Sequence, residues 1–239
     1  MTDIIILILQ CIAAYWVAGI FHELGHVLAG IAGGWKFQWI VVGFIGLKRL
    51  DSGHIRPYLE KNPLLWGGVG ATLPCDGDTA TTNVWATVLL CGPIASLVLG
   101  VISLPLGITL DITFLWILGA MSVGMGIACL LPVSSGILYT DGKRFMRLKG
   151  NGQEKAEEIA LFKSVMQKII EEDRFTLNQD DIEALKAAKL PNIQYYGQYY
   201  AYLFFKNNGD TDGMNRSVEA MKNIAAKVPK IIKAECVID

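Results

Sequence analysis

The chain has 239 residues and a formal net charge of −1; 52% of its residues are hydrophobic and only 18% are charged. A soluble globular domain carries about 25% charged residues, so this composition, with a mean hydropathy of +0.39, favours a protein in contact with lipid. The near-zero charge and the lack of a basic tract exclude a typical nucleic-acid-binding protein, and the five scattered cysteines indicate neither a disulfide framework nor a cysteine zinc site.

The first apolar segment covers residues 4–31 and contains no Asp, Glu, Lys or Arg as far as Phe21. About 20 such residues cross a bilayer as a helix. No basic residue precedes the segment, and no small-residue cleavage site closes it, so we expect a spanning helix that is retained rather than a signal peptide.

Near the end of this segment stands the pattern His22-Glu23-Leu24-Gly25-His26. Two histidines four residues apart project from the same face of a helix, and their spacing suits two ligands of a tetrahedral zinc ion. Glu23 is placed to act on a metal-bound water. Such groups are costly inside a membrane unless they have partners or a purpose. The alternatives are a polar patch that packs helices together and a helix end that lies outside the membrane.

Residues 36–60 have a different pattern, rich in β-favouring side chains such as Phe37, Trp39 and Val41 and containing the turn signal Asp51-Ser52-Gly53. This pattern predicts a β-hairpin at the membrane edge. The glycine-rich segment at residues 67–70 that follows is interpreted as a re-entrant loop, whose backbone must be covered by protein or water.

Two further apolar segments, at residues 84–106 and 112–131, are predicted to span the membrane, the last ending at Pro132. The N-terminus and the turn between these two segments carry no basic residue, whereas the other flanks are basic. Basic flanks face the cytoplasm, so we expect the N-terminus outside and the C-terminus inside. The basic residues are Lys36, Lys48, Arg49, Arg56, Lys61, Lys143, Arg144, Arg147 and Lys149.

From about Gly150 the composition becomes that of a soluble domain, with helical patterns at residues 154–173, 179–189, 192–207 and 214–228. The predicted fold is therefore a mainly α, polytopic membrane protein, with a three-helix core at residues 1–149 and a small cytoplasmic helical domain at 150–239. The segment Asn208–Glu219 also matches the ligand spacing of an EF-hand calcium loop, although Asn208 and Asn215 depart from the usual residues. Acidic turns between paired helices are common, so a plain helix-hairpin turn is the favoured interpretation.

Catalytic zinc needs a third protein ligand and an open fourth position. Asp111 falls on the far side of the membrane, and a lone histidine in a hairpin, such as His54, is more often a surface residue. Asp141 follows the third span on the same side as the histidines, and Gly142 allows the backbone to turn it inward. Position therefore favours Asp141 over the other candidates, which are Asp51, His54, Asp76, Asp78 and Asp111.

The segment from Phe21 to Gly30 resembles the first motif of the site-two protease family of intramembrane metalloproteases. The segment from Pro132 to Gly142 resembles the second motif, and Cys91-Gly92-Pro93 with the residues that follow resembles the Gly-Pro motif of the middle helix. This resemblance covers residues 4 to about 148. It implies that His22, His26 and Asp141 bind Zn²⁺ and that Glu23 is the catalytic base. Family members usually have Asn where Cys129 stands, and often where Ser96 stands.

The resulting expectation is a zinc endopeptidase of the cell membrane that cleaves transmembrane or membrane-associated proteins. Regulated intramembrane proteolysis is the candidate process, and a cytoplasmic regulator is the candidate partner of the C-terminal domain. An extended substrate strand could pair with the hairpin at residues 36–60. The alternative is a zinc-binding scaffold of little or no activity that recruits partners through its C-terminal domain, and Cys129 is its best support. A metal transporter would need polar ligands in several spans, and the second and third supply almost none.

Overall fold

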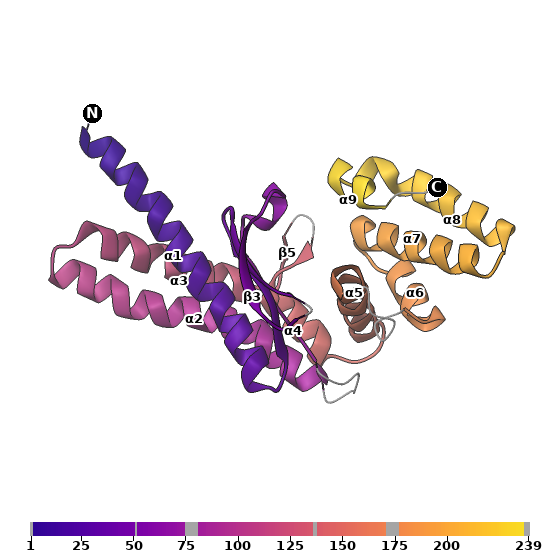
Figure 1. Ribbon diagram of the computed structural model, residues 1–239, viewed down its shortest axis with the longest axis horizontal. Coiled ribbons are helices and arrows are strands. Elements are labelled where there is room, and N and C mark those ends of the chain that lie inside the picture. The colour runs from indigo at the N-terminus through magenta and orange to yellow at the C-terminus, as the bar shows by residue number, and fades with distance from the viewer. Residues whose placement is uncertain (1, 51, 75–80, 136–137, 171–176, 237–239) are drawn as a thin grey trace. The chain divides into compact units, whose positions relative to one another are not determined.

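The computed structural model describes residues 2–50, 52–74, 81–135, 138–170 and 177–236. The chain forms two compact units (Figure 1). The first consists of Met1–Val133 with Thr140–Phe145, and the second of Ser134–Tyr139 with Met146–Asp239.

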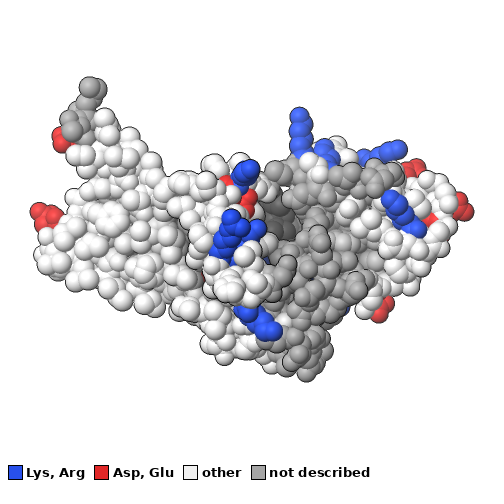
Figure 2. All heavy atoms as spheres, in the orientation of Figure 1, with Lys and Arg blue, Asp and Glu red and all other residues white. Residues whose placement is uncertain are grey.

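Three helices of the first unit are long and apolar enough to cross a membrane: α1 (Thr2–Ala32), α2 (Thr81–Thr109) and α3 (Thr113–Leu130). Helices α2 and α3 contain no Asp, Glu, Lys or Arg, and Figure 2 shows a broad uncharged surface over the helices. An exposed apolar surface of this extent is typical of contact with lipid. The three predicted spans are confirmed as helices of sufficient length and hydropathy, and α3 ends before Pro132 as predicted.

Small residues let these helices approach closely. A Cβ atom on Gly119 of α3 would lie 2.4 Å from the Leu104 backbone nitrogen of α2, so this crossing leaves no room for a larger residue. Helix α1 joins the pair through Ala14 and Ala18, which are fully buried in a cluster with Ile117 and Leu118 of α3.

Between α1 and α2 the chain forms a four-stranded antiparallel sheet of order β3-β2-β1-β4. Its strands are β1 (Lys36–Val42), β2 (Ile45–Arg49), β3 (Ile55–Leu59) and β4 (Val69–Leu73). The predicted hairpin is thus part of a larger sheet. The predicted re-entrant loop is wrong, because Val69 and Gly70 belong to β4. This strand is stabilised by its pairing with β1, which the glycine-rich local sequence does not predict.

The sheet packs along α1 (Figure 1). Thr72 of β4 lies against Gly30, while the turn between β1 and β2 brings Phe44 to Trp16, with ring centroids 5.3 Å apart. Gly30 and Trp16 are fourteen residues apart in sequence, which corresponds to about 21 Å along a helix that rises 1.5 Å per residue. The sheet therefore covers much of the C-terminal half of α1, including residues 22–26, which we call the HELGH segment.

After α3, the short strands β5 (Ser134–Ser135) and β6 (Leu138–Tyr139) form a hairpin that leads into α4 (Asp141–Lys149). The remaining helices are α5 (Gln153–Ile170), α6 (Gln179–Lys186), α7 (Pro191–Asn207), α8 (Thr211–Ile224) and α9 (Lys230–Glu235). One-turn 3₁₀ helices lie at Pro63–Leu65 and Ala225–Lys227. The sequence patterns predict α5 to α8, although residues 171–176 lie outside the described residues, and they miss α4 and α9.

A buried ionic cluster holds α4 against α5 in the second unit. Arg147 contacts Glu157 at 2.6 Å and Glu158 at 3.2 Å, and all three side chains are almost completely buried. The guanidinium also lies 4.2 Å from the ring centroid of Tyr139. Burial, together with the neighbouring Glu157 carboxylate, raises the pKa of Tyr139 to about 12.

The segment Asn208–Glu219 holds a capped helix, as the favoured helix-hairpin interpretation expects, and not a calcium loop. Helix α8 begins at Thr211, and Asp210 caps it by accepting a hydrogen bond of 2.9 Å from the Gly213 amide. The stretch from Thr211 to Glu219 is therefore helical rather than wrapped around an ion. The acidic residues serve as a helix cap and first turn, a common use of Asp at this position.

Candidate metal centre

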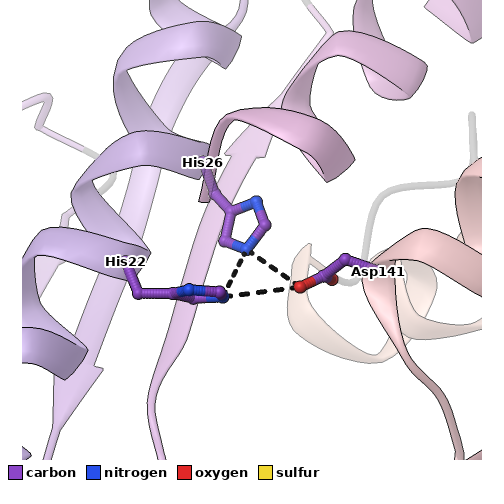
Figure 3. Close-up of side chains that lie close together, drawn as sticks. All are labelled: His22, His26 and Asp141. Carbon is purple, nitrogen blue, oxygen red and sulfur yellow. Dashed lines mark hydrogen bonds and ion pairs between the residues drawn. The ribbon is translucent and has the colours of Figure 1, made fainter. Parts of the chain in front are cut away.

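Three potential ligand atoms from distant parts of the sequence meet in the first unit (Figure 3). His22 and His26 lie one turn apart on α1, and Asp141 is the first residue of α4. The two Nε2 atoms are 3.2 Å apart, and Asp141 Oδ2 lies 3.4 Å from His22 Nε2 and 3.6 Å from His26 Nε2. Both histidines are buried, and the Asp141 side chain is 19% exposed.

These distances match three corners of a tetrahedron around one ion. Zinc lies about 2.0–2.2 Å from nitrogen and carboxylate ligands, which places tetrahedral ligand atoms roughly 3.3–3.6 Å from one another. The three observed separations, 3.2, 3.4 and 3.6 Å, lie in or beside this range. The geometry thus fits a small tetrahedral cation and leaves a fourth corner to which none of the three residues contributes.

The outer nitrogen of each imidazole has a partner as well. His26 Nδ1 lies 2.7 Å from the Val88 carbonyl oxygen, which can only accept, so this nitrogen carries a proton and donates it. His22 Nδ1 lies 2.9 Å from the Ser96 hydroxyl oxygen. In its neutral form His26 therefore directs a lone pair from Nε2 toward His22 and Asp141. A single added proton could bridge only two of these three atoms at a time, whereas a cation at the centre would bind His22, His26 and Asp141 together.

The Asp141 carboxylate is held in its ionised form. Burial alone would raise its pKa, but the close contacts with His22 and His26 and the charge of Arg144 outweigh burial and hold the pKa well below its usual range. Thr140 fixes the preceding turn, because its hydroxyl lies 2.5 Å from the Leu131 carbonyl oxygen and 3.0 Å from that of Val133. Asp141 and Gly142 form the first turn of α4.

Glu23 is buried next to the three ligands, on the side where β4 passes. A Cβ atom on Gly68 would lie 2.7 Å from Glu23 Oε1, and one on Gly70 would lie 3.1 Å from Oε2, so these glycines make room for the carboxylate. The Gly70 backbone amide is a hydrogen-bond partner of Glu23, which also interacts electrostatically with His22, His26 and Asp141. The predicted base is thus grouped with the predicted ligands.

Helix α2 completes the site through a close approach that only glycine allows. A Cβ atom on Gly92 would lie 2.2 Å from His26 Nε2 and 2.4 Å from Cε1. Sequence reasoning did not assign a role to Gly92, Val88 or Ser96 at the metal centre. The Gly-Pro pattern at residues 92–93 was a usable signal for Gly92, but a backbone partner such as Val88 leaves no trace in sequence.

The other candidate ligands do not join this group. His54 is exposed and pairs with Ser52 at 3.2 Å, and Asp111 is exposed in the turn between α2 and α3. Cys129 is half-buried and interacts electrostatically with Asp141 and Glu23, but the described cluster of ligand atoms does not include its sulfur. Asp51, Asp76 and Asp78 lie outside the described residues.

A scan against protein-family models finds no match, and searches of curated proteins and of solved structures find no significant match.

Proposed function

We propose that this chain is an intramembrane zinc metalloprotease that hydrolyses peptide bonds of membrane-associated proteins. The observation that carries the proposal is the meeting of His22, His26 and Asp141 at tetrahedral spacing beside the buried Glu23. Three of these four residues stand on a helix apolar enough to span a membrane. The resemblance of the surrounding motifs to the site-two proteases supports the same conclusion.

The ligand set favours zinc over other common cations. Two imidazoles and one carboxylate with an open fourth position are typical of catalytic zinc sites. Calcium and magnesium prefer six or more oxygen ligands, which these residues do not supply. When bound, zinc lowers the pKa of a bound water to about 7 and polarises a substrate carbonyl.

The protein's own residues supply the positioning and the proton transfer. His22, His26 and Asp141 hold the metal, and the hydrogen bonds to Val88 and Ser96 orient the two imidazoles. Glu23 takes a proton from the attacking water on a carboxylate oxygen and delivers it to the leaving amine. The burial of Glu23 and of both histidines limits competing water and strengthens these electrostatic interactions.

Strand β4 is the best candidate for presenting the substrate. It is an outer strand of the described sheet, with β1 as its neighbour, and Gly68 and Gly70 in and beside it contact Glu23. A helix hides its carbonyl groups, so a transmembrane substrate must become extended before it is cleaved. An extended segment paired with β4 would bring its peptide bonds next to Glu23. This strand differs from the expected one, because β4 lies outside residues 36–60, whose strand at the edge of the described sheet is β3.

We propose an orientation with the N-terminus outside and the C-terminal unit in the cytoplasm. The link between α2 and α3 contains Asp111 and no basic residue, whereas the sheet and α4 carry the basic side chains. Glu23 lies 21 residues beyond Thr2, or about 32 Å along α1, comparable to the roughly 30 Å hydrocarbon thickness. The metal centre then lies toward the cytoplasmic end of its helix.

The decisive experiment replaces Glu23 by Gln, which keeps the size of the side chain but removes its basicity. We expect the variant to retain zinc and to lose cleavage by a factor of about 10²–10⁴, the usual contribution of a general base. Comparing membrane-protein fragments in cells with the wild-type chain and with Glu23→Gln identifies the substrate, which accumulates uncleaved. Zinc content measured on the purified variant is the control for an intact site.

The alternative, a zinc-binding scaffold, predicts the opposite result. A scaffold would retain its cellular function after Glu23→Gln, and no membrane protein would accumulate. That outcome, with zinc bound in both proteins, would refute the protease proposal.

A further inference from the structure

The two histidines of the metal centre differ in what holds their outer nitrogens. His26 Nδ1 pairs with the Val88 carbonyl oxygen, a backbone group that accepts but cannot donate. His22 Nδ1 pairs at 2.9 Å with the hydroxyl of Ser96, which can do either. Ser96 is fully buried on α2 and His22 is 5% exposed, so water does not readily replace this contact.

The difference matters because a neutral imidazole carries only one proton. With a metal on Nε2, the proton of His22 stands on Nδ1 and needs an acceptor. Without a metal, the proton can move to Nε2 and be donated toward Asp141 Oδ2, 3.4 Å away, which leaves Nδ1 in need of a donor. A hydroxyl at Ser96 meets both needs by rotating its proton, whereas a carbonyl such as that of Val88 meets only the first.

We propose that Ser96 is a positioning residue that keeps the His22 ring aligned in both the metal-free and the metal-bound site. This inference rests on the proposed metal centre. The Val88 carbonyl keeps the His26 proton on Nδ1, which leaves Nε2 free to bind a metal. The Ser96 hydroxyl allows the His22 proton to stand on either ring nitrogen. Removal of the Ser96 hydroxyl leaves a buried N–H of the metal-bound form without a partner, and metal affinity falls.

Helix α3 offers a matched control. Ser122 is also fully buried in a spanning helix, and its hydroxyl has no hydrogen-bond partner among the described residues. Ser122→Ala therefore removes the same atom from a comparable environment without touching a ligand. It separates the loss of a buried hydroxyl from the loss of the contact to His22.

The test measures Zn²⁺ and Co²⁺ affinity of the full chain in lipid nanodiscs for wild type, Ser96→Ala and Ser122→Ala. We expect Ser96→Ala to bind about 10–100-fold more weakly, the usual effect of losing a partner of a ligating histidine, and Ser122→Ala to bind like wild type. The visible absorption of bound Co²⁺, which reports ligand geometry, should change only in Ser96→Ala.

Equal affinity and an unchanged Co²⁺ spectrum in Ser96→Ala would overturn the inference while leaving the metal centre intact. An equal loss in both serine variants, or failure of Ser96→Ala alone to fold without metal, would show that the hydroxyl is structural and would also overturn it. If the wild-type chain binds neither ion, the proposed metal centre itself fails. If metal binds as expected but Glu23→Gln changes no cleavage, the protease proposal fails and the role of Ser96 stands.

Discussion

The close approach of α2 to His26 makes Gly92→Ala a sharp perturbation of the metal centre. The added methyl carbon would lie 2.2–2.6 Å from three atoms of the imidazole ring, whereas ordinary non-bonded contacts are about 3.5 Å. The ring must therefore retreat by roughly 1 Å. His26 cannot do so and keep both its 2.7 Å contact to Val88 and its place near His22 and Asp141.

We expect Gly92→Ala to lose zinc affinity, and any cleavage activity to fall by about 10²-fold or more, because a 1 Å misplacement of a catalytic group has effects of this size. The assays are zinc content after dialysis against a competing chelator and cleavage of the substrate identified with Glu23→Gln. Wild-type zinc affinity in Gly92→Ala would refute the placement of α2 against His26.

Two other glycines separate this effect from general damage. A Cβ atom on Gly124 of α3 meets nothing within 4 Å, so Gly124→Ala should leave zinc binding unchanged. Gly119→Ala places its Cβ atom 2.4 Å from the Leu104 backbone, a comparable clash at another helix contact. It should lower stability while the folded fraction still binds zinc. An equal loss of zinc in both clashing variants would contradict a site-specific effect at Gly92.

The remaining predictions concern the second unit and the sheet. Arg147→Met leaves Glu157 and Glu158 buried without their cation and should destabilise the chain by about 3–5 kcal/mol in denaturant titration, whereas Lys155→Met on α5 should change stability by about 0.5 kcal/mol or less. Burial already raises the pKa of Glu157. A carboxyl with a raised folded-state pKa stabilises the fold when protonated, so the variant should lose more stability as pH rises; a deficit that does not depend on pH would contradict this account. Some proline substitutions along Val69–Leu73 should keep zinc but lose cleavage, because proline removes a backbone donor from β4. The control, Ile55→Pro on β3, should cleave normally. Normal cleavage by every β4 variant that still binds zinc would exclude pairing of the substrate with this strand.

Local features of the sequence were enough to predict the three long apolar helices and the proximity of the two candidate ligands on α1. The apolar runs are long, and residues spaced like His22 and His26 lie on the same face of a helix. The expected sidedness of the spans predicted Asp141 as the third member of the group, and the structure brings the three side chains together. These inferences need no knowledge of packing.

Features that depend on distant contacts were not predictable in the same way. Strand β4 is short and begins next to glycines, and only its pairing with β1, some thirty residues earlier, makes it a strand. Helix α4 begins at Asp141 itself and includes Gly142, a residue at which the sequence predicts a turn of the backbone. The partners of the imidazoles were missed because a backbone carbonyl carries no sequence signal and a serine in an apolar helix is ambiguous.

The ligands alone do not explain why the site forms where it does. His22 and His26 would be costly in an apolar helix if they faced lipid, but α2 brings the Val88 carbonyl and the Ser96 hydroxyl to them. Gly92 admits the His26 ring, and Gly70 admits the Glu23 carboxylate. The specificity of the HELGH segment therefore lies as much in the surfaces that surround it as in its own residues. A chain with the same five residues but larger neighbours would contain the motif without forming the site.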